Sequence, residues 1–178
     1  MRTFYGHEVD FEAFLRGEDI SFDIRDIAHA LSIEARFGGH TIEPVSVAAH
    51  SIRVYQRVVQ LTADMSGARR LHRGALLHDA SEAYLKDIPK ELKRLLKSYH
   101  LYEMGCEDAL SRCFDFPLNH SLIKEADMDV LILEWKRYRS DPPPSNLPTA
   151  DGVSVDYWEP DAATVRADFL RLADQLGC

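Results

Sequence analysis

The sequence lacks any long apolar run, and it contains only three cysteines among its 178 residues. No stretch approaches the roughly 20 apolar residues that a membrane-spanning helix needs. The first seven residues also lack the charged-then-apolar layout of a secretory signal peptide. These absences predict a cytoplasmic protein with no membrane association.

The three cysteines do not have the spacing of a zinc finger, and their odd number argues against a disulfide framework. Cys106 and Cys113 are seven residues apart on one expected helix, so they should share a face and fill the core. We expect a structural role for both of them and for Cys178.

Basic residues are in the minority, with 21 Lys and Arg against 29 Asp and Glu and a net charge of −8. Binding to polymeric nucleic acid depends on many Lys and Arg contacts to phosphates, so this charge argues against such a partner. A small phosphorylated ligand is still compatible with it. One metal ion and a few local basic residues can hold a nucleotide inside an acidic protein.

Internal repeats and strand-like alternation are also missing, whereas apolar residues recur at three- and four-residue steps along most of the chain. The sequence therefore predicts one all-α domain over residues 1–178, a bundle of six or seven helices. Prolines 142–144 open a long loop, expected to run to about Pro160, before the last helix. The helices are expected at residues 22–35, 44–61, 68–85, 89–96, 99–114, 121–138 and 162–176.

Polar side chains interrupt the apolar stripes of three expected helices. They are His50 on the second helix, the adjacent His78 and Asp79 on the third, and Asp127 on the sixth. Each alone has an ordinary alternative, as a satisfied core histidine or a buried salt-bridge partner. Together, two imidazoles and two carboxylates on buried stripes favour one divalent transition metal ion, such as Co, Mn, Zn, Fe or Ni.

These residues lie in segments that resemble the HD-domain phosphohydrolases, and most closely the small YfbR-like 5′-deoxynucleotidase branch. The resemblance covers about residues 23–135. It implies an HD-domain helical bundle in which His50, His78, Asp79 and Asp127 bind the metal. The supporting segments are RFGGH (36–40), SVAAHS (46–51), LLHDASE (76–82), DIP (87–89) and EAD (125–127).

Glu82 follows His78 by four residues and Asp79 by three, so a regular helix would turn it toward the same cavity. A carboxylate there can orient a water molecule or pass a proton to the leaving oxygen. The alternative is a solvated helix carboxylate. The resemblance implies a catalytic role for Glu82, and we expect Asp79 to share in positioning the water or managing its proton.

Arg36 closes the first expected helix, and its planar fork of donors matches phosphate oxygens. A cation at that end of a helix also suits the helix dipole, and the resemblance favours the phosphate contact. Phe37 and His40 are expected to flank the base or sugar, although packing is the ordinary role of such residues. Lys90 and Lys93 are expected to reach the outer phosphates of a triphosphate, the alternative being surface charge.

The resemblance implies hydrolysis of the 5′-phosphate ester of 2′-deoxynucleotides. Deoxynucleoside monophosphates would give deoxynucleoside and phosphate. Triphosphates such as dATP would give deoxynucleoside and triphosphate, as in the phage dATP triphosphohydrolase-like proteins of the same group. Both reactions cut at the same phosphorus, so the metal motif fits either. By analogy the protein forms a homo-oligomer, a dimer or a hexamer.

Two alternatives to the hydrolase are a catalytically silent nucleotide-binding sensor and a di-iron oxygenase on the same fold. The sensor predicts loss of a ligand or of Glu82, and the sequence retains them all. The oxygenase needs ligands for a second metal ion. His100 and His120 fall in the interval where two-metal relatives carry extra histidines, but neither lies on an evident buried stripe. The sequence therefore favours a single ion.

Overall fold

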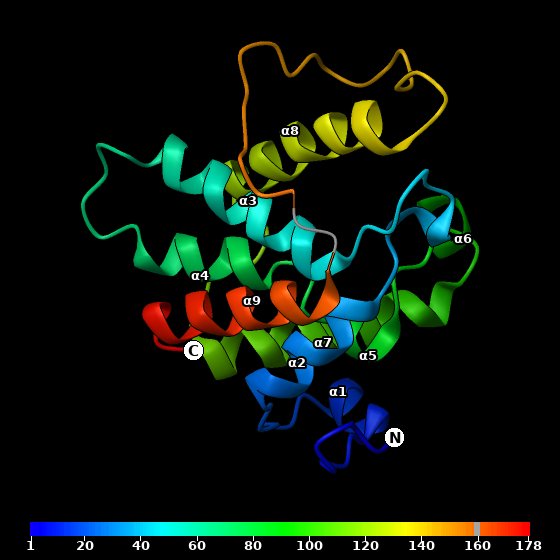
Figure 1. Cartoon of the computed structure of the whole chain (residues 1–178). Helices are drawn as coiled ribbons and strands as arrows, with labels where there is room; N and C mark the ends of the chain where they lie inside the picture. Colours follow the sequence, from blue (N-terminus) through cyan, green and yellow to red (C-terminus); the bar gives the residue numbers. More distant parts are fainter. Residues whose placement is uncertain (159–160) are drawn as a thin grey trace.

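The computed structural model describes residues 1–158 and 161–178, and within them the chain is helical and forms no strand (Figure 1). The all-α prediction is confirmed. No helix in the described residues combines the length and apolar character that crossing a membrane requires. The elements are α1 (Phe11–Arg16), α2 (Ile24–Ile33), the 3₁₀ helix η1 (Arg36–Gly39), α3 (Val47–Leu61), α4 (Arg69–Leu77), α5 (Glu82–Leu85), α6 (Lys90–Lys93), α7 (Lys97–Phe114), α8 (Ser121–Tyr138) and α9 (Ala162–Leu176).

Short polar side chains set the starts of the helices that carry the fold. Asp23 caps α2 by accepting a hydrogen bond from the Arg25 amide, and Ser46 caps α3 in the same way through Ala49. The second expected helix therefore begins after Ser46 and not at Pro44. The last helix begins and ends where the sequence predicted it.

The expected helix over residues 68–85 is interrupted, and this correction concerns the site. α4 ends at Leu77, and tighter bonds follow, from the Ala80 amide to Leu77 O and from the Glu82 amide to Asp79 O, both 3.0 Å. These are three-residue hydrogen bonds of the 3₁₀ type, and α5 resumes at Glu82. Apolar periodicity does not distinguish such a turn from a continuous helix.

The helix expected at 89–96 is shorter in the structure, where α6 ends at Lys93. The next helix, α7, begins at Lys97, two residues before its expected start.

The sequence pattern did not predict α1. The loop expected at Gly38 and Gly39 is the 3₁₀ helix η1, in which Phe37 and Gly38 have left-handed φ values of 55° and 58°.

The expectation for the cysteines is wrong at Cys113. Cys106 is buried in the core, but Cys113 is exposed because it lies at the end of α7, where Phe114 takes the core position. Cys178 is half-buried against the core. All three lie within the described residues and are free thiols.

α3 is the central helix, and it packs against α2, α4, α8 and α9 (Figure 1). Val47 and Ile52 on α3 join the main core, which also contains residues of α2 and α9. Val54 and Val58 on the same helix face a second, smaller core shared with α4 and α8. A polar residue on α3 is therefore enclosed from several sides, as His50 is.

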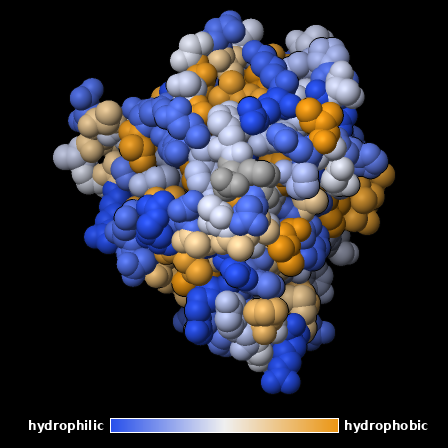
Figure 2. Space-filling model, viewed as in Figure 1, coloured by the Kyte–Doolittle hydropathy of each residue, from blue (hydrophilic) through white to orange (hydrophobic). Residues whose placement is uncertain are grey.

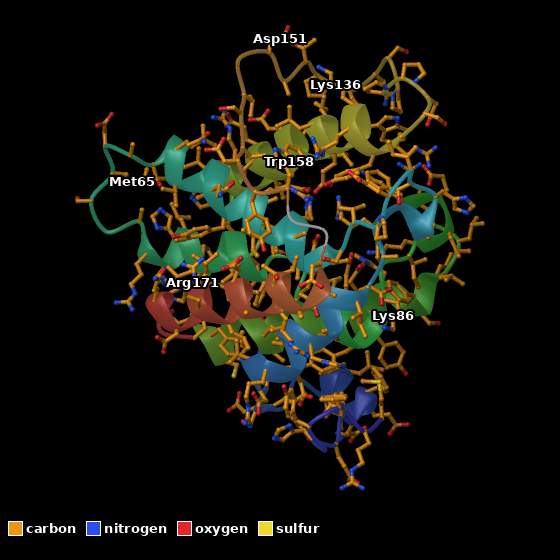
Figure 3. All side chains as sticks on the ribbon, viewed as in Figure 1. Met65, Lys86, Lys136, Asp151, Trp158 and Arg171 are labelled. Carbon is orange, nitrogen blue, oxygen red and sulfur yellow. The ribbon has the colours of Figure 1, made fainter. Side chains whose placement is uncertain are left out.

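The long loop between α8 and α9 returns over α3 (Figure 1). The side-chain Nε2 of Gln60 on α3 donates to Ser154 O at 3.0 Å. The side-chain Oε1 of Gln56 accepts a hydrogen bond from the backbone N–H of Asp156. Trp158 lies at the end of this described stretch, beside α3 (Figure 3). The loop was expected to end at about Pro160, which lies outside the described residues.

The face seen in Figure 2 carries hydrophilic and hydrophobic residues side by side. The chain's exposed apolar side chains come from several elements, including Ile33 at the end of α2 and Leu95 after α6. Single exposed apolar residues of this kind are normal on a protein surface.

Phe169 on α9 is fully buried in the main core, so Phe169→Ala should lower the free energy of unfolding by about 3–5 kcal/mol. Ile33→Ala, at a residue that is 64% exposed, should change it by no more than about 0.5 kcal/mol. Urea unfolding followed by circular dichroism measures both. Equal effects of the two substitutions would contradict this placement of the core.

Candidate metal centre

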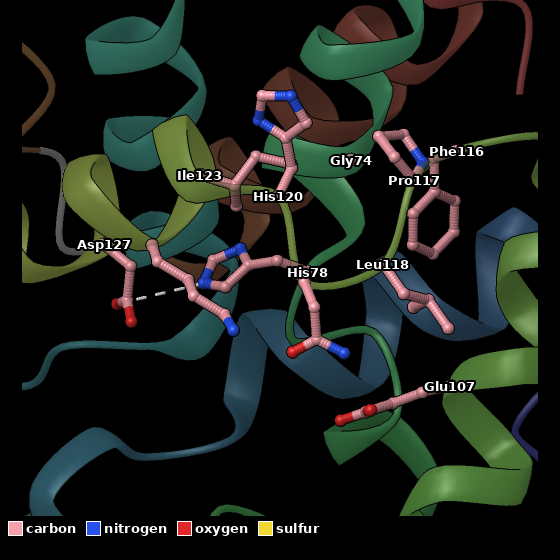
Figure 4. Close-up of a pocket in the computed structure, with 11 residues that line it drawn as sticks. Gly74, His78, Glu107, Phe116, Pro117, Leu118, His120, Ile123 and Asp127 are labelled. Carbon is pink, nitrogen blue, oxygen red and sulfur yellow. Dashed lines mark ion pairs between the residues drawn. The ribbon is translucent and has the colours of Figure 1, made fainter.

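Three of the predicted ligands meet at one point, although they come from distant parts of the chain. One ligand atom each of His50, His78 and Asp127 lies within 4.8 Å of the others. His50 Nε2 is 3.0 Å from Asp127 Oδ1, and His78 Nε2 is 4.0 Å from the same oxygen. The ring of His78 faces Asp127, which projects from α8 (Figure 4).

Asp79 completes this group from the tight turn after α4. Its Oδ2 lies 3.2 Å from His78 Nε2 and 3.7 Å from His50 Nε2. The structure therefore brings together all four residues that the sequence singled out as metal ligands. We call His50, His78, Asp79 and Asp127 the ligand group.

Hydrogen bonds on the far side of each imidazole fix which nitrogen faces the ligand group. Nδ1 of His50 is 3.1 Å from both carboxylate oxygens of Glu134, and Nδ1 of His78 is 2.9 Å from Ala75 O. A carbonyl or carboxylate oxygen only accepts, so Nδ1 carries the proton in each ring. Each imidazole then turns its Nε2 toward the carboxylates of Asp79 and Asp127, where either a proton or a metal ion can lie between the nitrogen and an oxygen.

This donor set fits a cation. His78 Nε2 is buried and, among the described residues, makes no hydrogen bond of acceptable geometry, even at 3.2 Å from Asp79. Imidazole nitrogens and carboxylates that face one another at these distances need a proton or a metal ion between them. Two imidazole nitrogens and two carboxylates are ligands that Mn, Fe, Co, Ni and Zn accept.

The charges of the group reinforce one another. Burial alone would lower the pKa of His78, but the Asp79 and Asp127 carboxylates outweigh it and raise that pKa to about 9. Burial alone would raise the pKa of Asp79, but His78, His50 and Arg36 hold it well below its usual value. The pKa of Asp127 is lowered in the same way, chiefly by His50. Both carboxylates are therefore ionised at neutral pH, as metal binding requires, whereas a metal ion would have to displace the proton that these carboxylates favour on His78.

Glu82 begins α5 and is buried beside the ligand group. Among the described residues its Oε2 has no hydrogen-bond partner, and Lys93 Nζ lies 3.8 Å from Oε1. Burial, and then the negative charges of Asp79 and Asp87, raises the pKa of Glu82 well above its usual value. The solvated carboxylate considered as an alternative is therefore wrong, because the side chain lies in the protein interior.

Arg36 lies in η1, and its side chain is only 10% exposed. Its Nε donates to Glu134 at 2.9 Å, and its NH1 lies 3.7 Å from Asp79 Oδ2. Burial would lower the pKa of Arg36, but Glu134 and Asp79 raise it above its usual value. The guanidinium therefore borders the ligand group as a permanent positive charge.

The other expected substrate contacts lie further out. Phe37 packs edge to face on Trp135, with 5.7 Å between ring centroids, and lines a surface hollow together with the exposed His40. Lys90 is exposed at the first position of α6. Lys93 is paired with Glu103, with 2.6 Å between Nζ and Oε1, so it is not a free cation.

Two functional neighbours were missed by the sequence analysis. Glu134 is fully buried and contacts His50, Arg36 and Arg53, and its position seven residues after Asp127 places both on one face of α8. Arg53 follows His50 by three residues on α3 and donates to Glu134 at 2.6 Å. Those two spacings are the signal that could have found them. His50 and Arg36 outweigh burial and hold the pKa of Glu134 well below its usual value.

A cavity of about 140 Å³ adjoins His78 and Asp127 (Figure 4). His120 lines it and also caps α8, where its Nδ1 accepts a hydrogen bond from the Leu122 amide at 3.3 Å. His100 is exposed on α7. The remaining lining residues are Gly74, Glu107, Phe116, Pro117, Leu118, Asn119, Ile123 and Lys124.

A second His and Asp group lies near the N-terminus, made of His7, Asp23 and Asp26. Its carboxylates already have partners. Asp26 accepts from Thr3 Oγ1, the Tyr5 amide and His7, and Asp23 caps α2 and pairs with Arg25. This group ties the N-terminal segment to α2.

No family model matches the chain. The uncharacterized protein YfdR of Escherichia coli strain K12 is 33% identical to it over 135 residues, which cover 75% of this chain and 69% of YfdR. The chain therefore belongs to the YfdR family.

His78→Gln should weaken binding of Mn²⁺ or Co²⁺ by more than the roughly 10- to 100-fold that loss of an outer hydrogen-bond partner costs. The reason is that His78 presents its buried Nε2 directly to the ligand group. Isothermal titration calorimetry measures the affinity. His100→Gln, at a side chain that is 66% exposed, serves as the matched control and should bind like the unaltered protein. Unchanged affinity in His78→Gln would refute the ligand assignment.

Proposed function

We propose that this chain is a metal-dependent phosphohydrolase of the HD-domain type that cleaves the 5′-phosphate ester of 2′-deoxynucleotides. The observation that carries the proposal is the ligand group, in which two Nε2 atoms and two carboxylates from three separated segments share one space. The order of these residues along the chain and their flanking segments support it further through the resemblance described above. A homo-oligomeric state, a dimer or a hexamer, is part of the same proposal.

His50, His78, Asp79 and Asp127 would hold one divalent ion such as Co, Mn, Zn, Fe or Ni. When bound, such an ion polarises a phosphate oxygen and makes a water molecule acidic enough to attack phosphorus. The four side chains leave part of the space open, because Asp127 is still 42% exposed. Phosphate and water can therefore approach from that side.

Arg36 would bind the phosphate. Its Nε is occupied by Glu134, whereas its NH1 lies toward Asp79 and the ligand group. A fixed guanidinium in a buried setting stabilises the negative charge that grows on phosphate oxygens as the ester breaks. Because Glu134 already orders this side chain, little conformational entropy is lost when phosphate binds.

Glu82 would handle the proton. A buried carboxyl group with a raised pKa keeps its proton to higher pH than a solvated one, and it would give that proton to the 5′ oxygen of the departing deoxynucleoside. Its Oε2 has no partner among the described residues, so that atom is available for a substrate or water. The cavity beside His78 and Asp127 has a mixed lining, and its apolar part, which includes Phe116, Leu118 and Ile123, suits part of the deoxynucleoside.

Of the two substrate classes, deoxynucleoside monophosphates and triphosphates, the charges near the ligand group favour the monophosphates. Lys93, expected to reach outer phosphates, is paired with Glu103, and it also lies near Glu82. Asp87 and Glu107 are partly buried near the same charges, and the pKa of each is raised by burial and neighbouring carboxylates. Two further phosphates would bring more negative charge into this acidic surrounding.

The purified protein loaded with Co, Mn or Zn should release deoxynucleoside from members of a panel of deoxynucleoside mono- and triphosphates. Products are separated by chromatography and assayed as phosphate, pyrophosphate or triphosphate. Faster turnover of monophosphates is the expected result. Binding of nucleotides without any consumption would favour the silent sensor, and two irons per chain by metal analysis would favour the oxygenase.

Glu82→Gln should lower kcat by about 10²- to 10⁴-fold, because the amide cannot exchange a proton with water or the leaving oxygen. Metal affinity should be unchanged, since Glu82 is outside the ligand group. Steady-state kinetics on the best substrate of the panel, alongside metal titration, measures both quantities. Retention of full kcat would remove Glu82 from the mechanism and leave the metal assignment intact.

A further inference from the structure

Glu134 lies at the centre of a buried charge cluster, and the reaction scheme above uses it only to order Arg36. Its side chain is fully enclosed on α8. It accepts hydrogen bonds from Arg36 Nε at 2.9 Å and Arg53 NH1 at 2.6 Å, and both its oxygens are 3.1 Å from His50 Nδ1. An enclosed carboxylate is costly unless it is paired, and here two arginines supply the pairing.

The contact with His50 has a consequence beyond charge neutralisation. Two guanidinium groups already compensate the carboxylate, so the imidazole is not needed for that purpose. The Glu134 bond fixes the Nδ1–H form of the ring and directs Nε2 toward Asp127 Oδ1, at 3.0 Å. Carboxylates that hold metal-binding histidines in this way orient the ring and make it a stronger ligand.

We propose that Glu134 is a positioning residue that acts through His50 and Arg36 together, an inference that rests on the proposed function. One carboxylate holds the imidazole that faces the metal and the guanidinium that faces the phosphate. The distance between these two groups is therefore set by a single side chain. The same side chain would fix the position of the bound phosphate relative to the bound metal.

Arg53 restricts the side-chain conformation of Glu134, which keeps the carboxylate next to His50. Arg53, which contacts it, donates from Nε to Tyr157 O at 2.7 Å and from NH2 to the Tyr138 hydroxyl at 3.1 Å. The Arg53 guanidinium also lies over the ring of Trp158, 4.7 Å from its centroid. The long loop thus closes over Arg53, and Arg53 fixes Glu134.

A merely structural role for Glu134 makes a different prediction, and the chain offers a matched pair for comparison. Arg57 and Asp129 join the same two helices, α3 and α8, at 2.7 Å, and their side chains are 18% and 14% exposed. Neither contacts the ligand group in the described structure. Loss of this pair removes an ion pair between α3 and α8 without touching His50 or Arg36.

The test compares Glu134→Gln with Asp129→Asn and the unaltered protein. Metal-free protein is titrated with Co²⁺, and affinity is measured by chelator competition together with the visible spectrum of the bound ion. We expect Glu134→Gln to bind Co²⁺ about 10- to 100-fold more weakly, with an altered spectrum. At saturating metal its KM for a deoxynucleoside monophosphate should rise at least about tenfold, because Arg36 loses its anchor. Asp129→Asn should match the unaltered protein in all three measurements.

Equal Co²⁺ affinity and an identical spectrum in Glu134→Gln would overturn the inference and leave the proposed function standing. Failure of the unaltered protein to bind any divalent ion would overturn both. If Glu134→Gln does not fold, nitrogen NMR of histidine in the zinc-loaded unaltered protein decides. His50 bound through Nε2, with a proton on Nδ1 in a hydrogen bond to Glu134, supports the inference. Binding through Nδ1 overturns it.

Discussion

Two imidazole nitrogens and two carboxylates face one small space between α3, α8 and the turn after α4. The hydrogen bonds of Nδ1 to Glu134 and to Ala75 direct both Nε2 atoms inward, toward the carboxylates. Such a space is stable only with positive charge in it, and the surrounding structure reflects that constraint. Arg36 borders the ligand group, and Arg53 lies one layer further out.

Much of the fold was readable from the sequence because the helices are amphipathic and have polar caps. Ser46 and Asp23 fix the starts of α3 and α2, and the prolines after α8 separate it from the last helix. The short α1 carries too few residues to show a period. The turn at His78 and Asp79 escaped notice because three- and four-residue hydrogen bonding leave nearly the same apolar pattern.

The ligand group was predictable from the sequence, whereas the only sequence signal for Glu134 was its seven-residue spacing from Asp127. His50 and Asp127 stand out because each interrupts an otherwise apolar stripe. Glu134 lies in a segment of α8 that also carries exposed Lys136 and Arg137, so its sequence surroundings resemble a solvated face. Only the positions of Arg36 and Arg53, from two other segments, turn that glutamate into a buried partner of His50.

The contacts of Arg53 with Tyr157 and Trp158 have a consequence for how the protein folds during synthesis. The contact between Arg53 and Tyr157 spans 104 positions of the chain, and contacts of such long sequence separation cost loop-closure entropy and slow folding. During synthesis, His50 and His78 leave the ribosome well before residues 153–158, which close over α3. The nascent protein therefore gains the loop that supports Glu134 only after all four ligands, and a chain that ended before residue 153 would carry every ligand without that support.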